Sequence, residues 1–475
     1  MSFIFYDIIF LILFVTFVFI FLNSRKKNLK REGLLILYKA SWGIKLINCI
    51  GKKAPKTFRV LSYISITIGY ILMVSIIYLI GKIVYIYATR PDIVRAIKIP
   101  PLIPLVPYLP EIFKLDFLPS FPFTYWIIII AIIAITHEFA HGIFAAHNKI
   151  KIKSTGFGFF PFFLPIFLAA FVELDEKRMA KKDKFSQLAI LSAGTFANVL
   201  TAILFFIVIF IFFVLAFAPS GVIFDTYPYS VVGISGISMI NGVALENPTY
   251  EKILELSNES GFNRIRAGEK NYVTTKNDLE KQKEINGNLL LYYDAPAINA
   301  NLESIIFKIN GVKIKSIEDL QEELSKYSPG DKITLNTLNK DGDDYDRDII
   351  LGENPENKNL PWLGVGFSSQ ERSGGLGKIY SALAFKDPHI HYQSKFGDLG
   401  LFIYDLLWWL VLISLSVALI NMLPVGIFDG GRFFYLTALA IVKSESKAEK
   451  LFKFSTYFIL SLFLLLMLLW AFSFV

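Results

Sequence analysis

The stretch Ile127–His147 reads IIIIAIIAITHEFAHGIFAAH and decides the fold. It is apolar almost throughout, and as a helix it is long enough to cross a bilayer. His137, Glu138 and His141 form an H-E-x-x-H motif inside it. Positions i and i+4 lie on one face of a helix, so both imidazoles can reach one metal ion, with Glu138 beside it to accept a proton from water.

Ionisable side chains inside a membrane helix are costly. Each charged group costs roughly 2.5–3.5 kcal/mol at the helix centre. The chain has five histidines, and two of them fall at metal-ligand spacing within this one segment. The motif could arise by chance, but its position in an apolar segment favours a working metal site.

The composition indicates a membrane protein. The 475 residues are 54% hydrophobic, with a mean hydropathy of +0.51, which suits a multispan chain with room for one soluble domain. Lys and Arg gather beside apolar segments, so they indicate topology and not nucleic-acid binding. The single cysteine, Cys49, excludes an internal disulfide and a cysteine-based zinc site. The run Phe3–Leu22 lacks a basic start and a cleavage site, so we expect a retained span.

Basic clusters predict the orientation of the spans. They follow the first span, flank the segment between the third and fourth spans, and lie between the fifth and sixth, which places all three in the cytosol. The N-terminus, the loop 91–122 and the polar region 219–398 are then extracytoplasmic. Segment 32–59 is too short to span, and it either lies on the cytosolic membrane surface or packs in the core. The expected spans are at about 3–22, 60–88, 123–147, 188–218, 399–423 and 452–475.

The segment Gly156–Val172, GFGFFPFFLPIFLAAFV, is apolar but contains Pro161 and Pro165. Flanking charges place both its ends in the cytosol, so it cannot span. We expect a re-entrant, strand-like hairpin that lines a cavity, because lipid-exposed irregular backbone is not tolerated in a membrane. A surface loop that dips into the headgroups is the alternative.

The polar region 219–398 divides into two parts. Residues 221–286 show weak periodicity, whereas 287–368 show the pattern of a small α/β domain with a hairpin turn at Asn310-Gly311 and a helix capped by Ser316. This pattern resembles a PDZ domain, which implies that it binds peptide ends or strands. The strands are expected at Leu289–Tyr293, Ser304–Ile309, Ile333–Leu338 and Asp348–Leu351.

A catalytic zinc needs a third protein ligand and one open position. His137 is about 14 residues into its helix, or roughly 21 Å, which places it in the cytosolic third of the bilayer. Asp405 lies near the opposite end of the fifth span. Asp429 lies just past the cytosolic end of that span, where Pro424 and Gly426 break the helix. Asp429 is therefore the better candidate, with an ordinary turn residue as the alternative.

Four motifs lie within about 123–200 and 399–432, namely His137-Glu138-x-x-His141, Ala193-Gly194-x-x-x-Asn198, Asn421-x-x-Pro424 and Asp429-Gly430. Together they resemble the site-2 protease family of intramembrane zinc metalloproteases. The resemblance implies that Zn²⁺ is bound by His137, His141 and Asp429, that Glu138 is the general base, and that Asn198 and Asn421 flank the site. It further implies that the hairpin offers a strand edge to an unwound substrate helix.

The sequence thus predicts an α-helical polytopic membrane protein of about six transmembrane helices, with a re-entrant hairpin and an α/β PDZ-like extracytoplasmic domain. Its expected partners are transmembrane protein substrates, the lipid bilayer and a peptide ligand of the PDZ-like domain, without nucleic acid. A catalytically silent relative and a metal transporter are the alternatives. The expected parts are a membrane region at 1–122, the catalytic core at 123–218 and 399–475, an insert at 219–286, the PDZ-like domain at 287–368 and a linker at 369–398.

Overall fold

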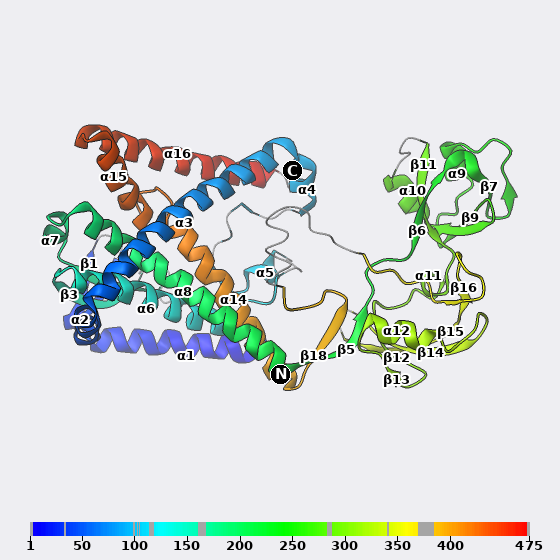
Figure 1. Ribbon diagram of the computed structural model, residues 1–475, viewed down its shortest axis with the longest axis horizontal. Helices are drawn as coiled ribbons and strands as arrows, with labels where there is room; N and C mark the ends of the chain where they lie inside the picture. The colour runs from blue at the N-terminus through cyan, green and yellow to red at the C-terminus, as the bar shows by residue number, and fades with distance from the viewer. Residues whose placement is uncertain are drawn as a thin grey trace. The chain divides into compact units, whose positions relative to one another are not determined.

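The chain divides into two compact units in the computed structural model, and each is described by itself (Figure 1). The helical unit comprises residues 1–213 and 401–475, and the inserted unit comprises residues 214–400. The structure describes residues 3–32, 35–97, 100–101, 103, 105–113, 118–159, 168–282, 287–339, 342–368 and 384–472.

Six helices among the described residues are long and apolar enough to cross a membrane, as the sequence predicts, so the chain is a multi-pass membrane protein. Most of these helices begin earlier than expected, because a polar first turn precedes the apolar segment in the same helix. They are α1 (Phe3–Ser24), α3 (Pro55–Thr89), α6 (Phe123–His147), α8 (Lys184–Ala216), α14 (Gly397–Asn421) and α16 (Glu445–Phe472). The shorter helices of this unit are α2 (Ile44–Lys53), α4 (Pro91–Ile97), α5 (Leu109–Ile112), α7 (Glu176–Ala180) and α15 (Asp429–Val442).

A four-stranded antiparallel sheet belongs to the helical unit, in the order β1-β2-β3-β4. Its last two strands form the predicted hairpin, while Pro161 and Pro165 lie outside the described residues. The first two strands were not predicted. They precede α2, whose Ile47 is fully buried, so this part of segment 32–59 packs in the core. The strands are β1 (Leu29–Glu32), β2 (Leu35–Ala40), β3 (Ile152–Phe159) and β4 (Leu168–Leu174).

A buried carboxylate joins α1 to the start of α6, the helix that carries the H-E-x-x-H motif. The Asp7 side chain is only 2% exposed. It accepts hydrogen bonds from the backbone N–H groups of Phe123 and Thr124 at 2.8 and 2.9 Å, and from the hydroxyls of Thr124 and Tyr108. These are N–H groups that a helix start leaves unpaired, so Asp7 caps α6 from a neighbouring helix.

We expect Asp7→Ala to destabilise the helical unit by about 2 kcal/mol, since capping losses cost about 0.5–2 kcal/mol and here buried donors lose their partner. Thermal unfolding of the purified protein in detergent measures this, as a lowered midpoint. Asp398→Ala is the matched control, because Asp398 is an exposed acid in the first turn of another apolar helix. Equal midpoints for both variants would contradict the capping role.

The inserted unit contains a six-stranded sheet in the order β6-β11-β10-β9-β7-β8, mostly within residues of weak periodicity. The expected strand at 289–293 belongs to this sheet, where it pairs with β6 and β10, so the sheet crosses the expected boundary at residue 287. The elements are β6 (Tyr229–Gly233), β7 (Ile237–Ile240), β8 (Val243–Ala244), α9 (Tyr250–Glu255), β9 (Asn263–Ala267), β10 (Lys270–Thr274), α10 (Lys276–Gln282) and β11 (Asn288–Tyr293).

The second sheet of this unit runs β15-β14-β12-β5-β18, with β13 paired to β12. The expected turn is confirmed by positive φ angles of 47° and 82° at Asn310 and Gly311. The expected cap is also confirmed, because the Ser316 hydroxyl accepts a hydrogen bond from the Asp319 N–H. The elements are β5 (Phe217–Ile223), α11 (Pro296–Asn299), β12 (Ile305–Ile309), β13 (Val312–Lys313), α12 (Ile317–Leu324), β14 (Lys332–Leu338), β15 (Asp344–Ile350), the pair β16 (Gly352–Glu353) and β17 (Pro361–Trp362), and β18 (Ile390–Ser394).

Candidate metal centre

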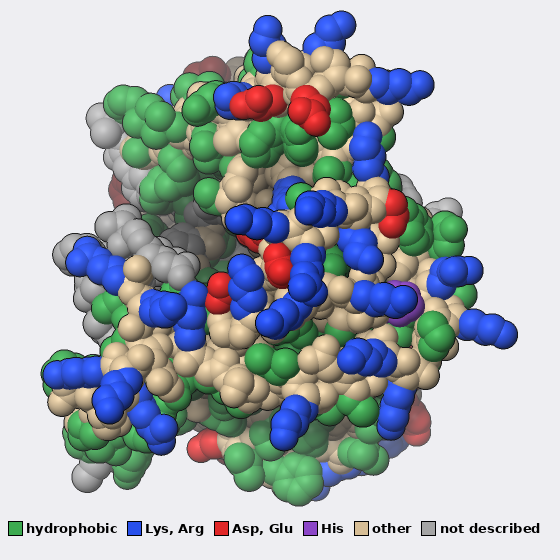
Figure 2. Space-filling view, turned by 90° about the vertical axis from the view of Figure 1, so that its left-hand side faces the viewer, with side chains coloured by type: hydrophobic (Ala, Val, Ile, Leu, Met, Phe, Trp, Pro, Cys, Tyr) green, Lys and Arg blue, Asp and Glu red, His purple; other side chains and the backbone are tan. Residues whose placement is uncertain are grey.

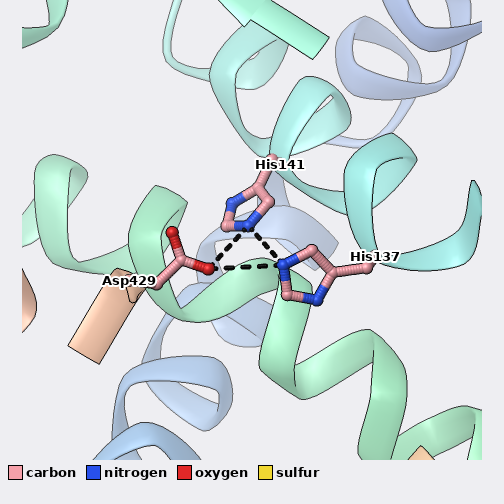
Figure 3. Close-up of side chains that lie close together, drawn as sticks. All are labelled: His137, His141 and Asp429. Atoms are coloured by element: carbon pink, nitrogen blue, oxygen red, sulfur yellow. Dashed lines mark hydrogen bonds and ion pairs between the residues drawn. The ribbon is translucent and has the colours of Figure 1, made fainter. Parts of the chain in front are cut away.

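Three side chains from distant parts of the chain point toward one another, as Figure 3 shows. His137 and His141 lie one turn apart on α6, and Asp429 is the first residue of α15. The two Nε2 atoms are 3.1 Å apart, and Asp429 Oδ2 lies 3.1 Å from His141 Nε2 and 3.3 Å from His137 Nε2. This is the one group of three or more such donors that the described residues form.

The triangle of donor atoms fits a zinc ion. Zinc binds histidine nitrogen and carboxylate oxygen at about 2.0–2.2 Å with tetrahedral geometry, which places donor atoms about 3.3 Å from one another. The distances here, 3.1–3.3 Å, are close to that value. Two imidazoles and one carboxylate also leave one position open, which is the ligand set of a catalytic site.

Hydrogen bonds orient both imidazole rings. His141 Nδ1 lies 2.7 Å from the Ile190 carbonyl oxygen, so Nδ1 carries the proton that it donates, and Nε2 keeps its lone pair. His137 Nδ1 lies 3.0 Å from the Asn198 side-chain amide, whose Oδ1 is buried without a partner among the described residues. A half-turn of the amide would place Oδ1 against His137 Nδ1–H, so that Oδ1 gains a donor and Nε2 keeps its lone pair. Both Nε2 atoms are then free for metal.

The backbone of α8 approaches the two imidazoles at Gly194. A Cβ at this position would lie 2.4 Å from His141 Nε2 and 2.5 Å from His137 Nε2. These are the nitrogen atoms that face Asp429, so any side chain at position 194 would occupy space beside the donor triangle. The absence of a side chain therefore shapes the cradle of the site.

We expect Gly194→Ala to lower zinc content, because the added methyl group pushes the two imidazoles away from their common point. Zinc per protein after a mild chelator wash measures the effect. Gly81→Ala is the matched control: Gly81 lies in the long apolar helix α3, and a Cβ there meets nothing within 4 Å. A Gly194→Ala protein that keeps as much zinc as the Gly81→Ala protein would show that the methyl group is accommodated.

A tight turn after α14 presents Asp429. A Cβ at Gly430 would lie 2.3 Å from the Met422 carbonyl carbon, so the chain folds back closely upon the helix end, as Gly430 permits. Burial alone would raise the pKa of Asp429, but His141 and His137 beside it lower this pKa well below its ordinary value. The two neighbouring histidines thus favour the ionised carboxylate, which is the form that binds a metal ion.

Glu138 lies beside the triangle and outside it. Its Oε2 accepts a hydrogen bond from the Val172 N–H of β4 at 2.9 Å. With His141 and Asp429 it lines a cavity of about 680 Å³. Four basic residues and the acidic Glu173 and Glu176 also line that cavity. Figure 2 shows many Lys and Arg side chains on the face where β1, α7 and α15 lie. Glu138 can thus meet water beside the donor triangle. The four basic residues are Lys39, Lys153, Lys177 and Arg432.

The other predicted residues lie in different places. Asn198 contacts His137, whereas Asn421 ends α14, and among the described residues no hydrogen bond joins its side chain to the donor triangle. Asp405 is not in the metal group. The contacts of Val172 N–H and the Ile190 carbonyl were missed, because both belong to the backbone and no residue type signals them.

The comparisons agree with this geometry. The model of one family, Peptidase family M50, matches residues 125–466, which is most of the chain and includes the whole donor triangle. A search of curated proteins gives no match. Members of this family are zinc metalloproteases, and the three convergent side chains can hold a metal ion. With its six apolar helices, the chain belongs to peptidase family M50 and is a membrane metalloprotease of that family.

Proposed function

We propose that the protein is a site-2-type intramembrane protease that binds zinc and hydrolyses peptide bonds in or near transmembrane helices of other membrane proteins, in regulated proteolysis. The observation that carries this proposal is the position of the donor triangle. Two of its members lie inside α6, one of the six helices apolar enough to span a membrane. A metal site at that depth meets the apolar segments of other membrane proteins.

The chemistry rests on a division of roles within the site. When bound, zinc acts as a Lewis acid that activates water and polarises the carbonyl of the scissile bond. His137, His141 and Asp429 hold it, and Asn198 and the Ile190 carbonyl keep the two rings in the metal-binding tautomer. Glu138 accepts the proton of the attacking water and passes it to the leaving amine.

The edge of β4 supports a mode of substrate binding. A helical substrate hides its peptide groups in its own hydrogen bonds, so it must unwind before hydrolysis. β4 is the last strand of its sheet, and the Val172 N–H that points outward from this edge meets Glu138. Ala170 is two residues away, so its N–H and C=O face the same way. We propose that the unwound segment pairs along this edge and is thereby led to the general base.

The proposed orientation places the site toward the cytosol and the inserted unit outside. Its support is the positive-inside rule together with the basic face of the helical unit (Figure 2). Water would enter the site through the cavity beside Glu138, which is lined by four basic and four acidic side chains.

We further propose that the second sheet of the inserted unit, with α12, acts as a PDZ-like domain that selects substrates. The support is the strand–turn–helix–strand order of β12, β13, α12 and β14, with a buried apolar core between the helix and the sheet. Because strand edges and grooves of such domains bind extended peptides, this domain would filter the ectodomains of substrates.

Cleavage of a model transmembrane helix tests the proposed function. The protein and the substrate are reconstituted in liposomes, and mass spectrometry maps the new termini. We expect cuts within the apolar segment or a few residues from it, which a chelator stops and added zinc restores. Cuts confined to soluble loops would contradict the proposal. Stable binding without cleavage in the zinc-loaded protein would favour the catalytically silent relative.

A further inference from the structure

A basic pocket lies in the inserted unit, far along the chain from the metal centre. It has a volume of about 410 Å³ and lies between β5, β18 and the β12–β13 hairpin. Four of the eleven residues that line it are lysines, and none is acidic. Residues 219–398 as a whole carry 26 acidic and 19 basic side chains, so the overall charge of this region does not explain a purely basic pocket. The lysines are Lys308, Lys313, Lys315 and Lys395.

The pocket occupies a wedge in the sheet. β12 pairs with β5 only at Ile305–Ile223 and Ile306–Val222, whereas β18 pairs with β5 as far as Phe217. The edge of β5 over 217–220 that faces β12 is therefore without a strand partner among the described residues. Lys308, Lys313 and Lys315 line the pocket from the β12–β13 side. Lys395 lines it from the end of β18, on the other side of β5, where its ammonium group also donates a hydrogen bond to the Leu215 carbonyl oxygen. A gap with backbone polar groups on one side and ammonium groups on the other suits an anion with oxygen acceptors.

Two of the lysines oppose each other directly. Lys308 and Lys313 are cross-strand partners in the β12–β13 hairpin, and like charges in this position destabilise a hairpin. No ion pair of Lys308, Lys313 or Lys315 is found with any acidic residue that the structure describes. An anion between the two ammonium groups would remove the repulsion.

The chain ties this pocket to the membrane surface. α8 ends at Ala216 and Pro219 follows three residues later, while Lys395 precedes the start of α14 by two residues. Since an extended chain spans at most about 3.6 Å per residue, the pocket lies within roughly 11 Å of the ends of two spanning helices. Large apolar side chains adjoin it in sequence and are exposed, namely Leu215 (67%), Phe396 (61%) and Leu399 (61%). Exposed apolar groups next to lysines are typical of a membrane interface.

We propose that this pocket binds the phosphate headgroup of an anionic phospholipid. Lys308, Lys313, Lys315 and Lys395 contact the phosphate, and the exposed apolar side chains at the helix ends lie among the acyl chains. The positive-inside rule does not account for these lysines, because the predicted topology puts them on the side opposite the cytosol. The site does not depend on the protease activity. It fixes β5 and β18, the two strands through which the chain enters and leaves the inserted unit, against the headgroups.

Lysine acetylation of the full-length protein in nanodiscs tests the proposal. In nanodiscs that contain phosphatidylglycerol, we expect the four pocket lysines to be acetylated at about one third or less of their rate in pure phosphatidylcholine nanodiscs, because the headgroup covers them. Lys358, an exposed lysine of the same unit outside the pocket, should react equally in both. Equal rates for the pocket lysines in both lipids would overturn the proposal.

Two further arms separate the source of the phosphate from simple surface charge. Glycerol phosphate dissolved around phosphatidylcholine nanodiscs should give no protection, and protection there would assign the pocket to a soluble anion instead. In Lys308→Gln/Lys313→Gln, Lys395 should lose its protection by phosphatidylglycerol, whereas Lys358→Gln should leave it intact. Protection of Lys395 that persists in the double variant would show that no shared site exists.

Discussion

Glu138→Gln is expected to reduce cleavage of a membrane-helix substrate by about a hundredfold to ten-thousandfold, the range for the loss of a general base. Zinc content should stay at the parental value, because Glu138 lies outside the donor triangle. The substitution is also gentle, since the Gln side chain keeps an oxygen that can accept the hydrogen bond of the Val172 N–H. Paired assays of cleavage and zinc per protein measure both outcomes.

Glu173→Gln provides the matched control. Glu173 lines the same cavity, but its carboxylate pairs with Lys39 and with the Ser154 hydroxyl, not with the metal centre. This variant should cut at close to the parental rate. A Glu138→Gln protein that is as active as the parent would remove Glu138 from the proposed chemistry.

Asp429→Ala is expected to lose both zinc and activity. Two imidazoles alone hold zinc weakly, and even the loss of an outer hydrogen-bond partner typically costs 10- to 100-fold in metal affinity, so loss of a ligand should cost at least about a hundredfold. After one chelator wash, zinc should be absent from Asp429→Ala and present in Glu138→Gln. This contrast separates a ligand from a base.

Asp405→Asn serves as the control for Asp429. Asp405 lies on α14, outside the group of donors that the described residues bring together. We expect this variant to keep its zinc and most of its activity. If Asp405→Asn lost zinc while Asp429→Ala kept it, the assignment of the third ligand would be wrong.

The parts of the site that follow from local rules could be predicted from the sequence. The spacing of His137 and His141 alone places them on one helix face, and the run of apolar residues in α6 predicts a helix long enough to span a membrane. Asp429 is 288 residues away from His141, and it could be reached only through the predicted topology and the family resemblance. The structure brings these three side chains together.

Other features depend on contacts that no residue type announces. The Ile190 carbonyl and the Val172 N–H act through the backbone, so only the folded chain reveals them. The pairing of strands could not be predicted for the same reason. β11 has a clear strand pattern, but nothing in its residues indicates that β6 and β10 are its neighbours. Asp7 did carry a signal, because an acid inside an apolar span requires a partner.

The pairing of β5 with β18 has a consequence for how this chain could have been assembled. Phe217, just after one spanning helix, lies opposite Ser394, just before another. The insert of about 175 residues therefore begins and ends at neighbouring positions. A chain without this unit would need only a short link at this point, because the two ends of the unit lie side by side. Whole modules can then be gained, exchanged or lost there during evolution, while the residues on either side keep their places.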